Sequence, residues 1–261
     1  MKRLVLLILC MLCLTACTQD MSLAYDKAVG LFADGNYAEA AQAFERLGEY
    51  AAAPTYAAYS RGLVFYGQGQ YAAAEPYFEQ TQNFMYGRER YRYCKAIRLM
   101  EEGAFADAAE LFGQSGEFED APMRRQYCLA RAAENAQDYE TALYAYEAAG
   151  QLEDAEDRLY NLRGQIYNRA IALRQEGQYE QAIILFNYLG DYLSAADQAL
   201  ECKTVFREEQ YAQGEALEAS GELREAYEVF SALGSYRDAV DRSETLAKRL
   251  GIAIHSDEPV F

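Results

Sequence analysis

Basic residues, prolines and histidines are scarce in this chain. It has 24 lysines and arginines against 41 aspartates and glutamates, which gives a formal net charge of −17. A phosphate backbone would repel such a chain, so nucleic acid is not an expected partner. The acidity itself has two interpretations, a basic partner or solubility alone. Four prolines in 261 residues, together with abundant alanine and tyrosine, favour helices.

Histidine occurs once, at His255, near the end of the sequence. A Ser–His–Asp or Cys–His pairing therefore cannot be built on the body of the chain, and no His/Cys cluster has the spacing of metal ligands. No glycine-rich phosphate loop stands between a strand and a helix. A pair of carboxylates is the remaining route to acid–base catalysis. We therefore expect a protein that is not an enzyme and that needs no metal and no cofactor.

The first sixteen residues have the organisation of a signal peptide. Lys2 and Arg3 precede an apolar run over residues 4–14. This run is shorter than the roughly 20 apolar residues of a membrane-spanning helix. The sequence Leu-Thr-Ala-Cys, which ends at Cys17, resembles the lipobox of bacterial lipoproteins. The resemblance implies cleavage after Ala16 and a lipid on Cys17; the alternative is an ordinary secretory signal with a chance cysteine.

The rest of the chain repeats one pattern around the motif Gly-x-Tyr-x-x-Ala. The aromatic or apolar anchors of this motif are Tyr37, Tyr71, Phe105, Tyr139, Tyr179 and Leu223. The first four lie 34 residues apart, and the last two intervals are 40 and 44. An alanine stands three positions after each anchor, at Ala40, Ala74, Ala108, Ala142, Ala182 and Ala226. A ring stands seven positions after it, at Phe44, Phe78, Phe112, Tyr146, Phe186 and Phe230.

Two more positions recur before each anchor. Twelve residues before it stand Tyr25, Tyr59, Tyr93, Tyr127, Tyr167 and Tyr211. Nine residues before it stand Ala28, Gly62, Ala96, Ala130, Ala170 and Gly214. Two residues before it a glycine recurs, except that Gln137 takes its place in the fourth unit. This glycine predicts a tight helix–helix turn with a positive φ.

The offsets predict a helical hairpin in every unit. The anchor, the alanine and the ring share one face of a helix, which we call helix B. The tyrosine and the small residue form the matching face of the preceding helix, which we call helix A. The longer intervals predict A helices without a break at 154–176 and 195–220, extended by about two and three turns. We expect residues 236–250 to form a final helix that covers the last hairpin.

Two sets of side chains have alternative interpretations. The six tyrosines twelve residues before the anchors either line a groove for a partner peptide or belong to the core. Cys94 and Cys128 occupy equivalent positions in adjacent A helices, and Cys202 lies in the last long one. Neighbouring helices are about 8–10 Å apart, which is too far for a disulfide between equivalent positions, so we favour buried, unpaired cysteines.

The period and the pattern Gly-x-Tyr-x-x-Ala-x-x-x-Phe are similar to those of the tetratricopeptide (TPR) family over about residues 22–250. The resemblance implies an all-α, right-handed α-solenoid of about six hairpins with a C-terminal capping helix, in which the A helices line a concave face. The chain departs from the family immediately before the recurrent tyrosine, where a large residue is missing, and two positions after it, where Lys27, Arg61, Lys95 and Arg169 replace a leucine. The units are therefore TPR-like.

These observations predict four segments: a signal peptide (1–16), a lipidated N-terminus with a short tether (17–21), the repeat array (22–250) and a loose tail (251–261). We expect a scaffold anchored by lipid to the cell membrane or outer membrane, on the extracytoplasmic face, that binds a protein or peptide through its concave face. A component of an envelope assembly, secretion or pilus machinery is one alternative. A carboxylate-dependent cell-wall-processing enzyme is another.

Overall fold

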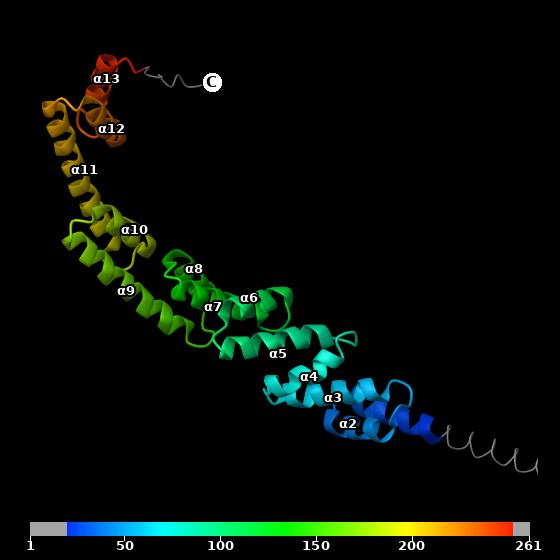
Figure 1. Ribbon diagram of the computed structural model, residues 1–261. Coiled ribbons are helices and arrows are strands. Elements are labelled where there is room, and N and C mark those ends of the chain that lie inside the picture. Colours follow the sequence, from blue (N-terminus) through cyan, green and yellow to red (C-terminus); the bar gives the residue numbers. More distant parts are fainter. Residues whose placement is uncertain (1–19, 253–261) are drawn as a thin grey trace, which may run out of the picture. The chain divides into compact units, whose positions relative to one another are not determined.

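The computed structural model describes residues 20–252 (Figure 1). Within this range the chain is all-helical and has no strand, and none of its helices is long and apolar enough to cross a membrane. The described residues divide into two compact units, one up to Glu156 and one from Asp157. The predicted signal peptide, the lipidation site Cys17, His255 and most of the predicted tail lie outside the described residues.

Short and longer helices alternate along the chain. In the first unit, a helix described over residues 20–33 is followed by α2 (Tyr37–Arg46), α3 (Ala53–Gly67), α4 (Tyr71–Gln80), α5 (Gly87–Glu101), α6 (Phe105–Gln114), α7 (Ala121–Asn135) and α8 (Tyr139–Ala149). The second unit holds α9 (Ala155–Gln175), whose first two residues belong to the first unit, then α10 (Tyr179–Leu189), α11 (Ala195–Ser220), α12 (Leu223–Leu233) and α13 (Ala239–Leu250).

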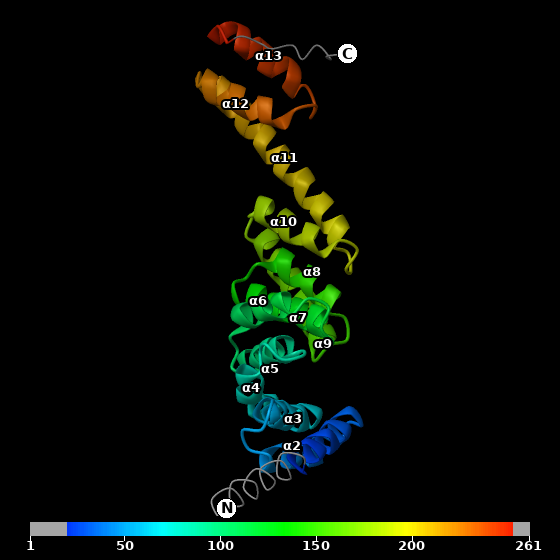
Figure 2. The same ribbon diagram turned by 90° about the vertical axis from the view of Figure 1, so that its right-hand side faces the viewer.

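The predicted hairpins are confirmed. Each B helix (α2, α4, α6, α8, α10 and α12) begins at its anchor residue. In the first unit every helix from α2 to α8 packs against the next one, and the same holds from α10 to α13 in the second unit (Figure 2). The fold is therefore an all-α array of helical hairpins, built by pairing of neighbours along the sequence.

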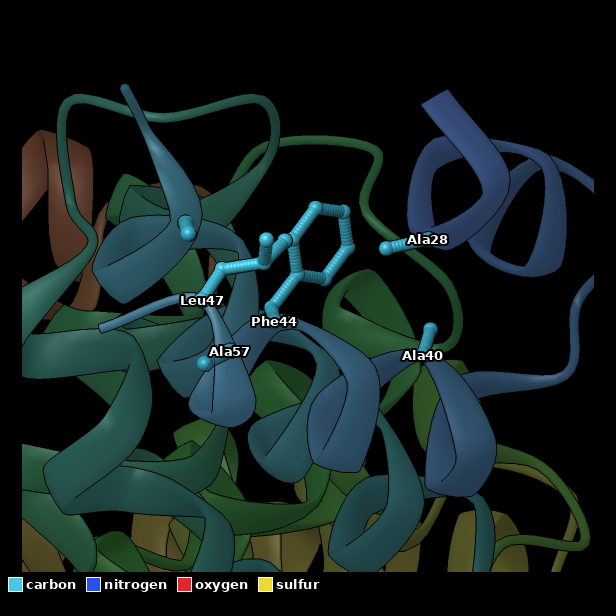
Figure 3. Close-up of a cluster of buried hydrophobic side chains, with 6 residues drawn as sticks. Ala28, Ala40, Phe44, Leu47 and Ala57 are labelled. Atoms are coloured by element: carbon cyan, nitrogen blue, oxygen red, sulfur yellow. The ribbon is translucent and has the colours of Figure 1, made fainter. Parts of the chain in front are cut away.

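The recurrent small and aromatic residues fill the interior of the hairpins. All six alanines three positions after the anchors and all six rings seven positions after them are completely buried, whereas the anchors themselves, except Phe105, are only partly buried. In the first hairpin the ring of Phe44 reaches toward Ala28 of the preceding helix (Figure 3). At Gly62 a Cβ atom would lie 2.8 Å from the Phe78 ring, so this glycine makes room for the ring.

The turn before each B helix has the predicted geometry. Gly35, Gly69, Gly103, Gly177 and Gly221 have φ angles between +71° and +87°. Gln137, which replaces the glycine, also adopts a positive φ, of +59°. A side chain rarely adopts this conformation without support from its surroundings.

The turn after each B helix holds a feature that the sequence did not predict. Fourteen residues after each anchor the backbone is again left-handed, but the residue there is never glycine: Ala51, Met85, Glu119, Glu153, Leu193 and Arg237. Two residues later stands a fully buried alanine, or Gly87 in the second unit, where a Cβ would lie 2.0 Å from the Thr81 carbonyl oxygen. The surrounding packing, including this buried small residue, holds the left-handed conformation. The turn therefore does not require a glycine.

The long A helices are confirmed as well. Helices α3, α5 and α7 have 15 residues each, whereas α9 has 21 and α11 has 26. The final helix begins at Ala239, three residues later than Tyr236, because Arg237 takes the left-handed conformation.

We predict that Phe112→Ala lowers the free energy of unfolding by about 3–5 kcal/mol, because the ring is completely buried and its loss leaves a cavity. The matched variant Tyr144→Ala removes a ring that is 72% exposed, and should stay within about 0.5 kcal/mol of the unsubstituted chain. Urea unfolding followed by circular dichroism measures both. Equal effects of the two substitutions would contradict the packing described above.

Candidate partner-binding surfaces

The six recurrent tyrosines lie in or against the core. Tyr59, Tyr93, Tyr127 and Tyr211 are at most 5% exposed, and Tyr25 and Tyr167 are partly buried. Each of the six rings meets the ring seven positions after its anchor edge to face, with centroids 5.5–6.4 Å apart. This geometry favours the core interpretation for the four buried rings. A groove role for Tyr25 and Tyr167 stays a prediction.

The hydroxyl groups of these tyrosines connect one hairpin to the next. The Tyr93 hydroxyl donates to Asp120, the residue that precedes α7, and the Tyr211 hydroxyl donates to Asp238, which precedes α13. The remaining pairs have the same separation of 27 residues: Tyr127 donates to Asp154 over 2.6 Å, Tyr167 shares a hydrogen bond of 2.8 Å with Ser194, and the Tyr59 hydroxyl accepts from the Tyr86 N–H over 3.3 Å. Each of these five hydroxyls therefore contacts the residue that precedes the next A helix.

These contacts also shift the pKa values of Tyr93, Tyr211 and Asp238. Burial, and then the hydrogen bond to Asp120, raise the pKa of Tyr93. The hydrogen bond to Asp238 raises the pKa of Tyr211, and the same bond lowers the pKa of Asp238. The Tyr211–Asp238 pair thus holds a neutral phenol against a carboxylate. Sequence reasoning missed this link, although an Asp-Ala or Ser-Ala pair before the A helix, as at 120–121, 154–155, 194–195 and 238–239, was a visible signal.

The cysteines follow the favoured prediction. Cys94, Cys128 and Cys202 are buried and unpaired. Burial raises the pKa of the Cys94 and Cys128 thiols to about 12, and it also raises that of Cys202. A buried neutral thiol acts as a small hydrophobic group. In residues 20–252 no group of three or more His, Cys, Asp or Glu side chains is arranged to hold a metal ion.

The second unit contains an open groove between α10, α11 and α12. Its volume is about 660 Å³. One wall comes from Ile183 and Asn187 of α10, and the other from Val229 and Ala232 of α12. The floor is one face of α11, formed by Ala196, Ala199, Leu200, Lys203, Phe206, Arg207 and Gln210. We call this feature the α11 groove.

The floor of the α11 groove combines apolar and basic side chains. Leu200 is 65% exposed, and Phe206 is partly buried. Lys203 and Arg207 are exposed, and among the described residues their side chains form no hydrogen bond or ion pair. Arg174, Arg237 and Arg242 of this unit, in contrast, are paired with carboxylates. Two unpaired bases over an apolar floor are a distinct feature in an acidic chain.

A second groove, of about 750 Å³, lies between α6 and α7 in the first unit. Residues at equivalent distances from the anchor line it, with Gln126 in place of Leu200 and Leu129 in place of Lys203. The Arg125 side chain lies over Gly113, where a Cβ would be 3.1 Å from its Nε atom. The long apolar side chain of Leu200 therefore has no counterpart in this second groove.

We predict that Tyr93→Phe lowers the free energy of unfolding by about 1–2 kcal/mol, because a partly buried hydrogen bond to a carboxylate is lost while the ring remains. Tyr160→Phe is the matched control: this ring is 70% exposed, and its substitution should change the stability by less than about 0.5 kcal/mol. Urea denaturation compares the two variants. An unchanged midpoint for Tyr93→Phe would refute a stabilising role of the hydroxyl.

The recurrent tyrosines and the α11 groove differ in what they offer a partner. The repeated tyrosines are occupied by contacts within the array, whereas the α11 groove exposes apolar and basic side chains. No protein-family model and no curated protein matches this chain.

Proposed function

We propose that this protein is a lipid-anchored, extracytoplasmic scaffold of TPR-like hairpins that binds a protein or peptide partner. One observation carries the proposal. The hairpin interiors are filled by their own recurrent residues, yet large apolar side chains remain outside them, among them Tyr160 and Leu200 at 70% and 65% exposure. Exposed aromatic and aliphatic groups on a rigid helical array are suited to recognition of another protein.

The TPR-like pattern implies that a partner binds to the exposed faces of the A helices. Tyr160 lies on α9, an A helix, and the exposed polar residues Asn161, Gln165 and Asn168 form a neighbouring face of the same helix. A ring beside amide groups provides rigid contact area together with hydrogen-bonding capacity. A role in assembly of the cell envelope would be one particular use of the same surface.

The anchoring part of the proposal rests on the signal-peptide pattern and on Cys17. We predict that Cys17→Ser moves the protein from the membrane fraction to the soluble fraction. Serine has no thiol, so the thioether to the lipid cannot form and the anchor is lost. Cell fractionation with immunodetection measures the distribution. Persistence of the variant in the membrane fraction would contradict lipid anchoring.

The binding part is tested by capture from detergent-solubilised membranes of the host. We expect one protein at a constant stoichiometric ratio to the intact lipoprotein. Recovery should fall at least several-fold with Tyr160→Ala, on an A helix, and should be unaffected by Tyr144→Ala, on a B helix with the same exposure. Failure to recover any protein at a fixed ratio would count against a scaffold. Equal recovery with both variants would exclude this A-helix face as the contact.

A further inference from the structure

The α11 groove has two walls, from α10 and α12, along a helix that is longer than its counterparts. Helix α11 has 26 residues, eleven more than α3, α5 or α7. At about 1.5 Å per residue the additional length is roughly 16 Å, whereas packed helices lie about 8–10 Å apart. Figure 1 shows α10 and α12 lying at separate places along α11. The additional length therefore leaves room for one more helix beside α11.

The exposed floor between the two B helices has the pattern of a helix-packing seam. Ala199, Lys203, Phe206 and Gln210 follow one another at intervals of three or four residues and line the same groove. Residues at such intervals share one face of a helix, which is the pattern by which a helix packs along another helix. Leu200 and Phe206 provide the apolar part of this seam, and the apolar side chain of Leu200 is left largely in solvent.

The charge at the floor indicates the chemistry of the occupant. Lys203 and Arg207 are one helical turn apart and have no partner carboxylate among the described side chains. The groove has one acidic lining residue, Glu180, on the first turn of α10. Lys and Arg side chains that line an apolar groove favour a ligand with carboxylates beside its apolar face, and they disfavour a basic one.

We propose that the α11 groove binds one amphipathic, acidic helix of a partner protein. Its apolar residues, at i, i+3 or i+4 and i+7, would contact Leu200 and Phe206, and glutamates or aspartates beside them would meet Lys203 and Arg207. This is recognition of a helix in a groove, with B helices as both walls. The inference deepens the proposed function and rests on it for the class of ligand, a protein segment. It assigns the contact to the face of α11 that lies between α10 and α12.

The probe is a synthetic, fluorescently labelled peptide of about 15 residues, alanine-based, with leucines at i, i+3, i+4 and i+7 and glutamates beside them. One control peptide has the same composition in scrambled order, and another has lysine in place of glutamate. Fluorescence anisotropy measures binding to the full-length protein in detergent. We expect micromolar binding of the amphipathic acidic peptide, and binding at least tenfold weaker for both control peptides.

Matched variants locate the site. Leu200→Ser and the double variant Lys203→Glu/Arg207→Glu should each weaken binding at least tenfold. Ile184→Ser changes an apolar residue of α10 that is 46% exposed and does not line the groove, and Arg224→Glu changes an exposed base of α12; both should change binding less than twofold. Circular dichroism verifies that each variant is folded, which is expected because the substituted side chains lie outside the core.

Three results would overturn the proposal: no binding of the acidic peptide, equal binding of the scrambled peptide, or equal loss in the control variants. A dimer in sedimentation experiments that Leu200→Ser dissociates would also overturn it, because a second copy of the chain would then be the occupant. The peptide experiment requires neither the lipid nor the natural partner. Its failure therefore leaves the Cys17→Ser and capture experiments to decide the proposed function separately.

Discussion

The contact of one aromatic ring with two small residues is the constraint on which every hairpin depends. The ring belongs to helix B, and the small residues are the alanine one turn earlier and the alanine or glycine on helix A. Burial of a phenylalanine side chain contributes about 1.5–3 kcal/mol, provided that the two helices approach closely enough to exclude water. At Gly62 and Gly214 even a methyl group would meet the ring at 2.8 Å. The spacing of the helices is thus set by the smallest side chains of the repeat.

The hairpins are joined by a second repeated contact. A tyrosine of one A helix packs against the ring of its own B helix, and its hydroxyl holds the residue that starts the next A helix. One side chain thereby contributes to the core of a hairpin and to the link with its neighbour. In five of the six units the tyrosine hydroxyl makes a contact that phenylalanine could not make. A partner therefore has little access to the four buried tyrosines.

Variation of the repeat produces the surface to which we assign recognition. The groove between α6 and α7 has Arg125 and Gln126 at the positions that Ala199 and Leu200 occupy in the α11 groove. Lengthening of α11 separates the two B helices that pack against it, and an apolar and basic face of α11 is left between them. The same residues would be an ordinary solvated helix face if walls from α10 and α12 did not flank them. The groove is thus a consequence of helix length as much as of residue type.

The sequence alone determined the helical hairpins, the residue at which each B helix begins, the positive φ before it and the two lengthened A helices. These features are local: each depends on spacing within about 40 residues, and spacing is directly visible in a sequence. Tertiary structure alone decided the core position of the four buried tyrosines, their hydrogen bonds 27 residues along the chain, the left-handed residues such as Glu119, and the α11 groove. These features depend on which faces of three or more helices meet. An exposed leucine or an unpaired lysine has no sequence pattern of its own, because its role is defined by the helices that pack around it.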